Sequence, residues 1–339
     1  MFQTKVMPCG EEGFSLAAAL LKKGEVVGIP TETVYGLAAN AYSPAAVSKI
    51  FEAKGRPQDN PLIVHISDLS MLDALVSAFP ETAQKLADAF WPGPLTMILP
   101  KSERVPFEVT AGLDTVGIRM PSHPGAAAVI RACELPLAAP SANTSGRPSP
   151  TKAEHVLYDM DGKIPLILDG GSCDVGVEST VVLVKPGAVH LLRPGGVTRE
   201  AMESLGIPVT VDPAVEAKLG QNAKVLSPGL KYKHYSPKAE VVIVKGSFDK
   251  FADYVNNKAE SGVYALVFEG EGRLLKTPAV VYGKKNDPAT QAAGLFDALR
   301  EVDARGARLV YARCPDQSGV GYAVYNRILR AAAFKVVEV

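Results

Sequence analysis

The chain has 339 residues, 47% of them apolar and 21% charged, which is typical of a soluble globular protein with two domains. Its 36 basic residues balance 36 acidic ones, so it lacks the basic excess of proteins that grip long nucleic acids. No apolar run approaches the roughly 20 residues of a membrane span, and no signal-peptide pattern is found, so we expect neither membrane insertion nor secretion. The four scattered cysteines, without a C-x-x-C pair, favour reduced thiols in a cytoplasmic protein.

The first elements of the chain carry clear start and stop signals. A short buried strand is predicted at 24–29, ending at Pro30. A helix follows, because Ser43 suits the N-cap, Pro44 suits the first helical position, and Gly55 is a typical residue after a helix end. The polar residues between this strand and this helix are therefore expected in a loop.

Two cations lie at the end of this helix, and they have two interpretations. Lys54 and Arg56 could simply compensate the helix dipole. Asn60 and His65 follow closely, however, and a cluster of cations with neutral hydrogen-bonding groups suits an anionic ligand. The second interpretation predicts a binding role for this segment.

Strands and helices continue to alternate up to about residue 207. Strands are predicted at 61–66, 95–99, 116–120, 135–139, 164–168, 179–184 and 189–192, and helices at 80–90 and 126–133. Ser149 and Pro150 repeat the cap pattern of Ser43 and Pro44, so they predict another helix, and Thr198 caps a last one ending at Gly206. This pattern predicts a twisted mixed sheet covered by helices, a domain that spans residues 1–207.

The remainder of the chain divides into a connector and a second domain. The connector, 208–238, includes the segment 227–237, in which two prolines and a glycine stand among lysines, tyrosines and a histidine, side chains that suit contact with a ligand. A second alternation follows over 239–339, with strands at 240–244, 263–268, about 280 and 308–312 and helices at 248–257, 288–306 and 320–334. It predicts a smaller, Rossmann-like α/β domain with a mostly parallel sheet.

Polar residues at strand ends supply the chemistry of the first domain. Arg119 lies in an apolar strand and is either part of a salt bridge or a partner for a substrate carboxylate. His65 is either structural or a ligand-binding residue, and the histidines show no zinc spacing. Neither Ser141 nor Ser179 lies in a nucleophile elbow, so hydrogen bonding is their expected use. Because Walker and G-x-G-x-x-G loops are missing, any phosphate must be bound by cations, hydroxyls and helix N-termini.

Four motifs together resemble those of one known family. They are 30–37 (PTETVYGL), 54–57 (KGRP), 140–143 (PSAN) and 192–195 (LRPG). In order and spacing they are similar to the YrdC-like family of L-threonylcarbamoyladenylate synthases over about the first 207 residues. The connector and the last α/β segment resemble the longer, two-domain form of that enzyme. The fold implied is a YrdC-like domain followed by a Rossmann-like domain.

The resemblance implies a reaction and its partners. The family condenses L-threonine, bicarbonate and ATP into threonylcarbamoyl-AMP and pyrophosphate, with Mg2+ carried by ATP and no protein-held metal. Downstream proteins transfer the threonylcarbamoyl group to the adenosine beside the anticodon of tRNAs that read A-starting codons. A weak direct contact with tRNA is left open, and no membrane partner is expected.

The resemblance also assigns residues, by position in the matching motifs. Lys54 and Arg56 would be the catalytic cations. Threonine would be bound by Thr33, His65, Arg119, Ala139 and Ser179. ATP would be bound by Arg56, Asn60, Thr115, Ser141, Asn143, Ser149, Arg193, Ser227, His234 and Tyr235. The connector that carries the last group is expected to cover the active site.

Two other functions remain as alternatives at this point. A nucleic-acid-binding module would use the basic cavity for RNA and would show salt-dependent tRNA binding without turnover. A carbamoyl-group transferase would contain a related module, but the cysteine-rich and acylphosphatase-like regions of such proteins are not found in this sequence. Zero net charge weighs against the first alternative.

Overall fold

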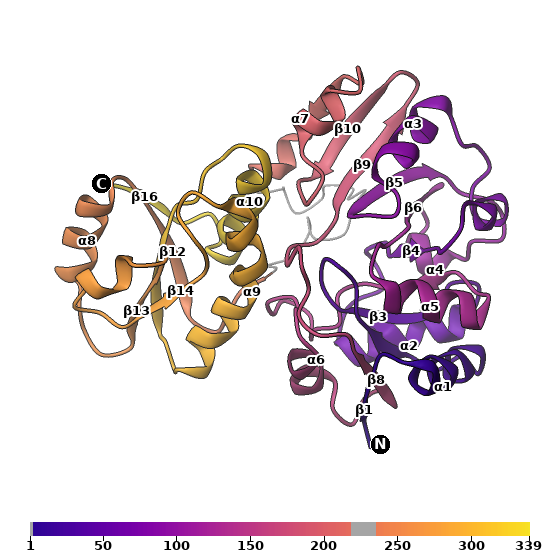
Figure 1. The fold of residues 1–339 in the computed structure, drawn as a ribbon, viewed down its shortest axis with the longest axis horizontal. Helices are drawn as coiled ribbons and strands as arrows, with labels where there is room; N and C mark the ends of the chain where they lie inside the picture. The colour runs from indigo at the N-terminus through magenta and orange to yellow at the C-terminus, as the bar shows by residue number, and fades with distance from the viewer. Residues whose placement is uncertain (1–2, 218–234) are drawn as a thin grey trace. The chain divides into compact units, whose positions relative to one another are not determined.

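The computed structural model describes residues 3–217 and 235–339, and these fall into two units (Figure 1). The first unit contains residues 3–145, 150–174 and 178–217. The second contains residues 235–339 together with two short segments from the earlier part of the chain, 146–149 and 175–177. Ser227 and His234 lie outside the described residues.

The first unit is a large mixed sheet with helices. Its strands are β1 (Lys5–Pro8), β2 (Val27–Ile29), β3 (Gly36–Asn40), β4 (Ile63–His65), β5 (Leu95–Pro100), β6 (Thr115–Arg119), β7 (Leu137–Ala138), β8 (Leu166–Asp169), β9 (Thr180–Lys185), β10 (Ala188–Arg193) and β11 (Val209–Val211). Its helices are α1 (Glu11–Lys22), α2 (Pro44–Lys54), α3 (Glu81–Phe90), α4 (Phe107–Thr110), α5 (Pro124–Cys133), α6 (Ala153–Met160) and α7 (Arg199–Glu203), with 3-10 turns at Leu69–Ala74 and Pro213–Val215.

The strand order of this sheet is β1-β8-β2-β3-β7-β4-β6-β5-β9-β10-β11. The central pairs combine both directions: β4 and β6 are parallel, β5 and β6 antiparallel, β5 and β9 parallel, and β9 and β10 antiparallel. The ends of β4, β6 and β10 and the beginnings of β5 and β9 therefore meet at one edge. The predicted mixed α/β architecture is confirmed.

One core cluster of the first unit lies between its helices and the sheet. Helix α1 contributes Ala17 and Leu21, α5 contributes Ile130, and both pack on buried residues of the β1-β8-β2-β3-β7 part of the sheet, including Val27 and Leu166. Figure 1 shows α1 and α5 running together beside these strands. At about 25 cal/mol per Å² of apolar surface, such burial is the main force that holds the sheet and its loops in place.

Cap residues and glycines in the sequence predicted most helix ends correctly. The Ser43 hydroxyl accepts a hydrogen bond from the N–H of Ala46 at 3.2 Å, Gly55 is left-handed at φ 61°, and Thr198 caps α7. The elements β1, α1, β3, α4 and β11 are not among the predicted ones. All but α1 are only three to five residues long and give no distinct periodicity, and α1 begins without a side-chain N-cap.

The cap predicted at Ser149 is wrong. Helix α6 begins at Ala153, and its N-cap is Lys152. The carbonyl of Pro150 instead accepts a hydrogen bond from the N–H of Tyr35 at 2.8 Å, and that of Thr151 accepts one from Cys173 at 3.0 Å. Tertiary hydrogen bonds therefore keep this stretch extended where the local sequence favours a helix.

The second unit is a smaller α/β layer structure. Its strands are β12 (Glu240–Lys245), β13 (Val263–Val267), β14 (Ala279–Val281), β15 (Leu309–Arg313) and β16 (Val336–Glu338), and its helices are α8 (Phe248–Asn256), α9 (Pro288–Ala304) and α10 (Gly319–Ala331), with a 3-10 turn at Glu271–Leu274. The order β14-β13-β15-β12-β16 is parallel throughout, as predicted, although β16 is not among the predicted strands. Figure 1 shows α8 on one side of this sheet and α9 and α10 on the other.

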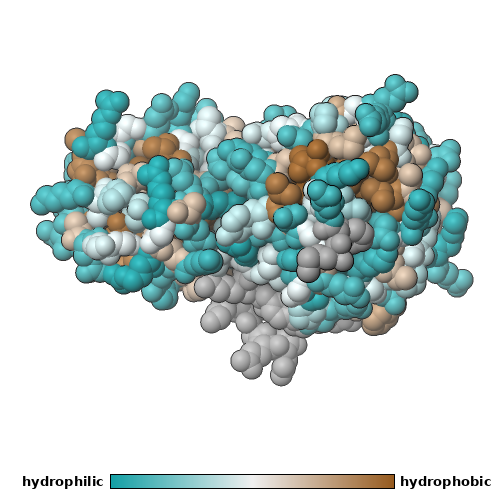
Figure 2. All heavy atoms as spheres, turned by 90° about the horizontal axis from the view of Figure 1, so that it is seen from below, coloured by the Kyte–Doolittle hydropathy of each residue, from teal (hydrophilic) through white to brown (hydrophobic). Residues whose placement is uncertain are grey.

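The surface shows no large apolar area on the face drawn in Figure 2, where hydrophobic residues form small groups among hydrophilic ones. Exposed large hydrophobic residues such as Phe107, Tyr158 and Leu274 come from separate elements. Scattered residues of this kind are normal on a soluble protein.

One glycine places the end of β10 against the beginning of β9, and its substitution gives a first prediction. A Cβ at Gly195 would collide with backbone atoms of Glu178, Ser179 and Thr180, which cannot move as a flexible side chain could. Gly195→Ala should lower the free energy of unfolding by about 1–3 kcal/mol, measured by chemical denaturation. Gly10→Ala is the control, because nothing lies within 4 Å of its Cβ position and its φ of 179° is extended; an equal effect in both variants would contradict the prediction.

Candidate active site

Three buried polar side chains lie level with one another on adjacent strands of the first unit. His65 ends β4, Arg119 ends β6, and Thr96 is near the start of β5, and the register pairs Arg119 with both of the others. Because side chains alternate along a strand, His65 shares a face with Ile63 and Thr96 shares it with Ile98, two members of one hydrophobic cluster. The polar row therefore lies on one face of the sheet, beside apolar packing.

Ser179 and Arg193 extend this row across β9 and β10. The Thr96 Oγ1 and Ser179 Oγ atoms are 2.8 Å apart. Arg193 donates from Nε to the carbonyl of Ser179 and from Nη2 to its hydroxyl, both at 3.1 Å. All three side chains are buried, so the antiparallel return of β10 builds a connected polar cluster in the interior.

The loop between β2 and β3 brings further polar groups to Arg119. Arg119 Nη1 donates to Thr33 Oγ1 at 2.9 Å, and Arg119 Nη2 forms an ion pair with Glu32 Oε1 at 2.8 Å. The loop is shaped by Thr31, whose hydroxyl donates to the carbonyl of Val34 at 2.6 Å and accepts from the N–H of Thr33 at 3.2 Å. A buried cation thus has a buried carboxylate beside it.

Burial and charge set the ionisation of this cluster. Burial would raise the pKa of Glu32, but the charge and hydrogen bonding of Arg119 outweigh it and hold that pKa below its usual value. Burial, and then the charge of Arg119, lowers the pKa of His65 to about 3. At neutral pH, Glu32 is therefore ionised and His65 is a neutral imidazole that can donate or accept a hydrogen bond.

A second cluster forms around the end of α2. Lys54 Nζ donates to the carbonyl of Asn143 at 2.7 Å and also to the carbonyl of Ser141. Burial, followed by the charge of Arg56, places the pKa of Lys54 well below its usual value. The left-handed conformation of Gly55 turns the chain directly after Lys54.

Asn60 and Thr115 lie near a hollow in the same unit. Arg56 Nη2 donates to the carbonyl of Asn60 at 3.3 Å, while both side-chain polar atoms of Asn60 are buried without a hydrogen-bond partner among the described residues. Thr115 and Thr96 both line a small hollow that begins at Pro61, next to Asn60. A buried amide without a hydrogen-bond partner is unusual, so Asn60 marks a candidate position for a polar ligand.

The structure brings together most of the predicted residues of the first unit. His65, Arg119 and Ser179 belong to the buried polar row, and Thr33 reaches it through its hydrogen bond with Arg119. Ala139 lies beside the row, donating its N–H to the carbonyl of Ile63 at 3.0 Å. The remaining predicted residues of this unit are Lys54, Arg56, Asn60, Thr115, Ser141, Asn143 and Arg193, whose contacts are given above.

Ser149 and Tyr235 belong to the second unit. Ser149 is buried, as is Tyr235, whose ring lies 5.4 Å from the ring of Phe296, centre to centre. The guanidinium of Arg327 lies 5.4 Å from the centre of the Tyr235 ring. Their assignment to a nucleotide stays a prediction.

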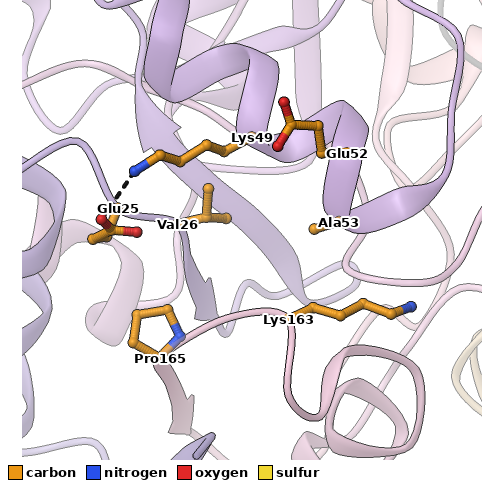
Figure 3. Close-up of a pocket in the computed structure, with 7 residues that line it drawn as sticks. All are labelled: Glu25, Val26, Lys49, Glu52, Ala53, Lys163 and Pro165. Carbon is orange, nitrogen blue, oxygen red and sulfur yellow. Dashed lines mark hydrogen bonds and ion pairs between the residues drawn. The ribbon is translucent and has the colours of Figure 1, made fainter. Parts of the chain in front are cut away.

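A larger hollow of about 490 Å³ lies elsewhere in the first unit (Figure 3). It is lined by Glu25, Val26, Lys49, Glu52, Ala53, Lys163 and Pro165. Lys49 pairs with Glu25 at 2.9 Å and Lys163 Nζ donates to the carbonyl of Asp159 at 2.8 Å, so these cations already have partners. We therefore place the site at the buried polar clusters rather than at this more voluminous hollow.

Two residues of the site were missed by sequence reasoning. Glu32 lies inside the motif at 30–37, but its burial beside Arg119 could be seen only in the folded structure. Thr96 gave a signal that could have been used, since it is the one hydroxyl residue in the otherwise apolar stretch 95–99. A buried hydroxyl in an apolar strand requires a partner.

Comparisons with known proteins match both parts of the chain. Residues 19–195 match a family model described as telomere recombination, and residues 197–333 match one described as threonylcarbamoyl-AMP synthase, C-terminal domain. The threonylcarbamoyl-AMP synthase of Bacillus subtilis is 49% identical, with 95% of this chain and 93% of that protein covered. The chain belongs to the threonylcarbamoyl-AMP synthase family.

This chain has the long, two-part form of the family. The threonylcarbamoyl-AMP synthase of Pyrococcus abyssi is 45% identical over 96% of this chain and 95% of that protein. The crystal structure of P. abyssi Sua5 complexed with L-threonine superposes with a TM-score of 0.90 at 42% identity, covering 100% of this chain and 99% of that one. Within the described ranges, every helix is too short or too polar to span a membrane.

The buried neutral His65 gives a prediction about stability. Its pKa falls from about 6.5 in the unfolded chain to about 3 in the folded one, so stability is full above pH 6.5 and is lost as the pH falls below it. Between pH 6.5 and 5 the wild-type protein should lose about 2 kcal/mol from this residue, at about 1.4 kcal/mol per pH unit. Glu32 stays ionised in this window because its pKa is lowered.

The measurement is urea denaturation of wild type and His65→Gln at several pH values. His65→Gln should be less stable at pH 7 but should lose less stability between pH 6.5 and 5. Equal slopes in the two proteins would show that His65 is not held neutral.

Proposed function

We propose that this chain is an L-threonylcarbamoyladenylate synthase that condenses L-threonine, bicarbonate and ATP into threonylcarbamoyl-AMP and pyrophosphate. The observation that carries the proposal is the buried row His65–Arg119–Thr96–Ser179 with Thr33, in a chain that superposes on a relative complexed with L-threonine. A downstream transfer to tRNA, the cytoplasmic location and the division at residues 207 and 238 are part of the same proposal.

The row supports recognition of a hydroxylated amino acid. Arg119 can pair with an α-carboxylate, since its Nε atom is buried without a hydrogen-bond partner among the described residues. Thr33, Ser179 and neutral His65 offer hydrogen bonds for the hydroxyl and amine. A site with such groups disfavours valine, because the groups would be left unpaired beside its methyl.

The cluster around the end of α2, together with Arg193 of the polar row and Thr115 of β6, supports recognition of a nucleotide triphosphate. Arg56 and Arg193 offer fixed positive charge, and Asn60, Thr115, Ser141 and Asn143 offer neutral hydrogen bonds. Lys54 has a lowered pKa, and an arriving polyanion would favour its protonated form. Ser149 and Tyr235 in the second unit, with Ser227 and His234 outside the described residues, remain predicted ATP contacts.

The residues present fit a nucleotide-borne metal better than a protein-held one. Throughout residues 3–217 and 235–339, no three His, Cys, Asp or Glu side chains converge on a metal position. Mg2+ would therefore be held mainly by phosphate oxygens, where it supplies further positive charge for the leaving pyrophosphate.

The chemistry requires positioning and charge stabilisation more than a protein nucleophile. The amine of threonine adds to CO2 derived from bicarbonate and loses a proton, which gives a carbamate. A carbamate oxygen then bonds to the α-phosphorus as the bond to the bridging oxygen breaks and pyrophosphate leaves with the electron pair. Arg119 would hold the amino acid, and Lys54, Arg56 and Arg193 would stabilise the phosphate charges.

The test is pyrophosphate release from ATP that depends on both L-threonine and bicarbonate. Arg119→Gln should lower kcat/KM for threonine by about 100-fold or more, because a buried charge pair with the substrate would be lost. This variant alone leaves the Glu32 carboxylate buried without its cation and could unfold the protein.

The double variant Glu32→Gln with Arg119→Gln removes both charges and is the fairer comparison. Arg131→Gln, an exposed arginine of α5, is the matched control and should behave as wild type. Absence of threonine-dependent release from wild type, or wild-type kcat/KM in the folded double variant, would contradict the proposal.

A further inference from the structure

Thr96 is a buried hydroxyl residue that no role assigned so far uses. It is 0% exposed and lies on β5 between Leu95 and Met97, which are also fully buried. Its Oγ1 atom is 2.8 Å from the Ser179 hydroxyl, and that is the one hydrogen bond the structure gives its side chain among the described residues. A buried hydroxyl in an apolar strand is unfavourable unless it forms hydrogen bonds, so we expect the Thr96 hydroxyl to have a role.

The surroundings fix the orientation of Thr96. The register pairs it with Arg119 on one side and Val181 on the other. Its methyl group faces Gly117, where an added Cβ would lie 3.3 Å from Thr96 Cγ2, so the absence of a side chain at Gly117 makes room for it. Since the χ1 angle of a β-branched residue is stiff, the hydroxyl is held toward Ser179.

The contact between Thr96 and Ser179 allows either hydroxyl to donate, and the two directions leave different hydrogens for a ligand. Arg193 Nη2 must donate to Ser179 Oγ, because a guanidinium has no acceptor. In either direction one hydroxyl hydrogen of this pair has no acceptor among the described residues: that of Thr96 if Ser179 donates, and that of Ser179 if Thr96 donates. If Thr96 donates, both lone pairs of Ser179 are used and its single hydrogen is left for a ligand.

We propose that Thr96 is a positioning residue of the amino-acid subsite, and that its hydrogen bond makes the Ser179 hydroxyl a donor directed at an oxygen of the substrate. The inference rests on the proposed function, because Ser179 is taken to touch threonine. By this proposal Thr96 affects the binding of threonine through Ser179 and does not affect the binding of the nucleotide.

The effect follows from the loss of one hydrogen bond. Thr96→Val keeps the β-branched shape and the packing on Gly117 but removes the donor, so the Ser179 hydroxyl is free to point elsewhere. KM for threonine should rise about fivefold, the amount expected for about 1 kcal/mol. KM for ATP should change less than about twofold, since Arg193 keeps both of its bonds to Ser179.

The experiment is a double-mutant cycle on the full-length chain. Thr96→Val, Ser179→Ala and the double variant are compared with wild type by steady-state pyrophosphate release at varied threonine and varied ATP. Thr96→Val should raise KM for threonine in the wild-type background and should have no further effect once Ser179 is alanine. Thr96→Ser, which keeps the hydroxyl, should restore most of the affinity.

Thr82→Val is the matched control, because Thr82 is a buried threonine of α3 whose hydroxyl accepts the N–H of Gly187 at 3.0 Å, away from Ser179. It should lower the melting temperature and leave KM for threonine unchanged. Thr96→Ala provides a second removal of the hydroxyl if Thr96→Val does not fold.

The outcomes separate the two proposals. Wild type without threonine-dependent turnover overturns the proposed function itself. Wild-type turnover with an unchanged KM in Thr96→Val, or an equal rise in KM in the Ser179→Ala background, overturns the role of Thr96 alone. A rise in KM for ATP equal to that for threonine also overturns it, because the effect would then be a general loss of structure.

Discussion

The buried ion pair of Arg119 and Glu32 is the interaction on which the rest of the first unit depends. Both side chains are about 95% buried, with the charged atoms 2.8 Å apart. An isolated buried charge is strongly unfavourable, so neither residue could occupy this place without the other. The pair fixes the loop 30–35 over the face of the sheet, and with it Thr33. The pair thereby keeps a cation in the interior, and the Nε atom of Arg119 has no hydrogen-bond partner among the described residues.

The register of the sheet places further polar side chains beside this pair, and together they form the candidate site. Parallel β4 and β6 set His65 beside Arg119, and antiparallel β5 sets Thr96 on its other side. The return of β10 along β9 adds Arg193, which bonds both the carbonyl and the hydroxyl of Ser179. The polar groups thus form two hydrogen-bonded sets on adjacent strands, one around Arg119 and one around Ser179.

This arrangement of polar groups requires neighbouring backbone segments to lie close together. Gly195 lies against the backbone of Glu178 to Thr180, and Gly117 leaves space for the methyl of Thr96. A side chain at Gly195 would collide with that backbone, whereas one at Gly117 would crowd the methyl group of Thr96. The packing around the site therefore restricts backbone positions that never touch a ligand.

The sequence by itself determined the local features of this protein. The caps at Ser43 and Thr198 and the helix end at Gly55 could be predicted because each signal lies within about four residues. The alternation of elements determined the α/β class and the parallel sheet of the second unit. The motifs determined the family and most candidate residues of the site.

Only the tertiary structure decided which of these residues meet. The extended stretch at Pro150 and Thr151 follows from hydrogen bonds to Tyr35 and Cys173, which override the local helix signal. The partnership of Glu32 with Arg119, and of Thr96 with Ser179, joins residues more than 80 positions apart. Pairings of this kind depend on strand order and register, which are set by the packing of the whole sheet and leave no trace in any short window of sequence.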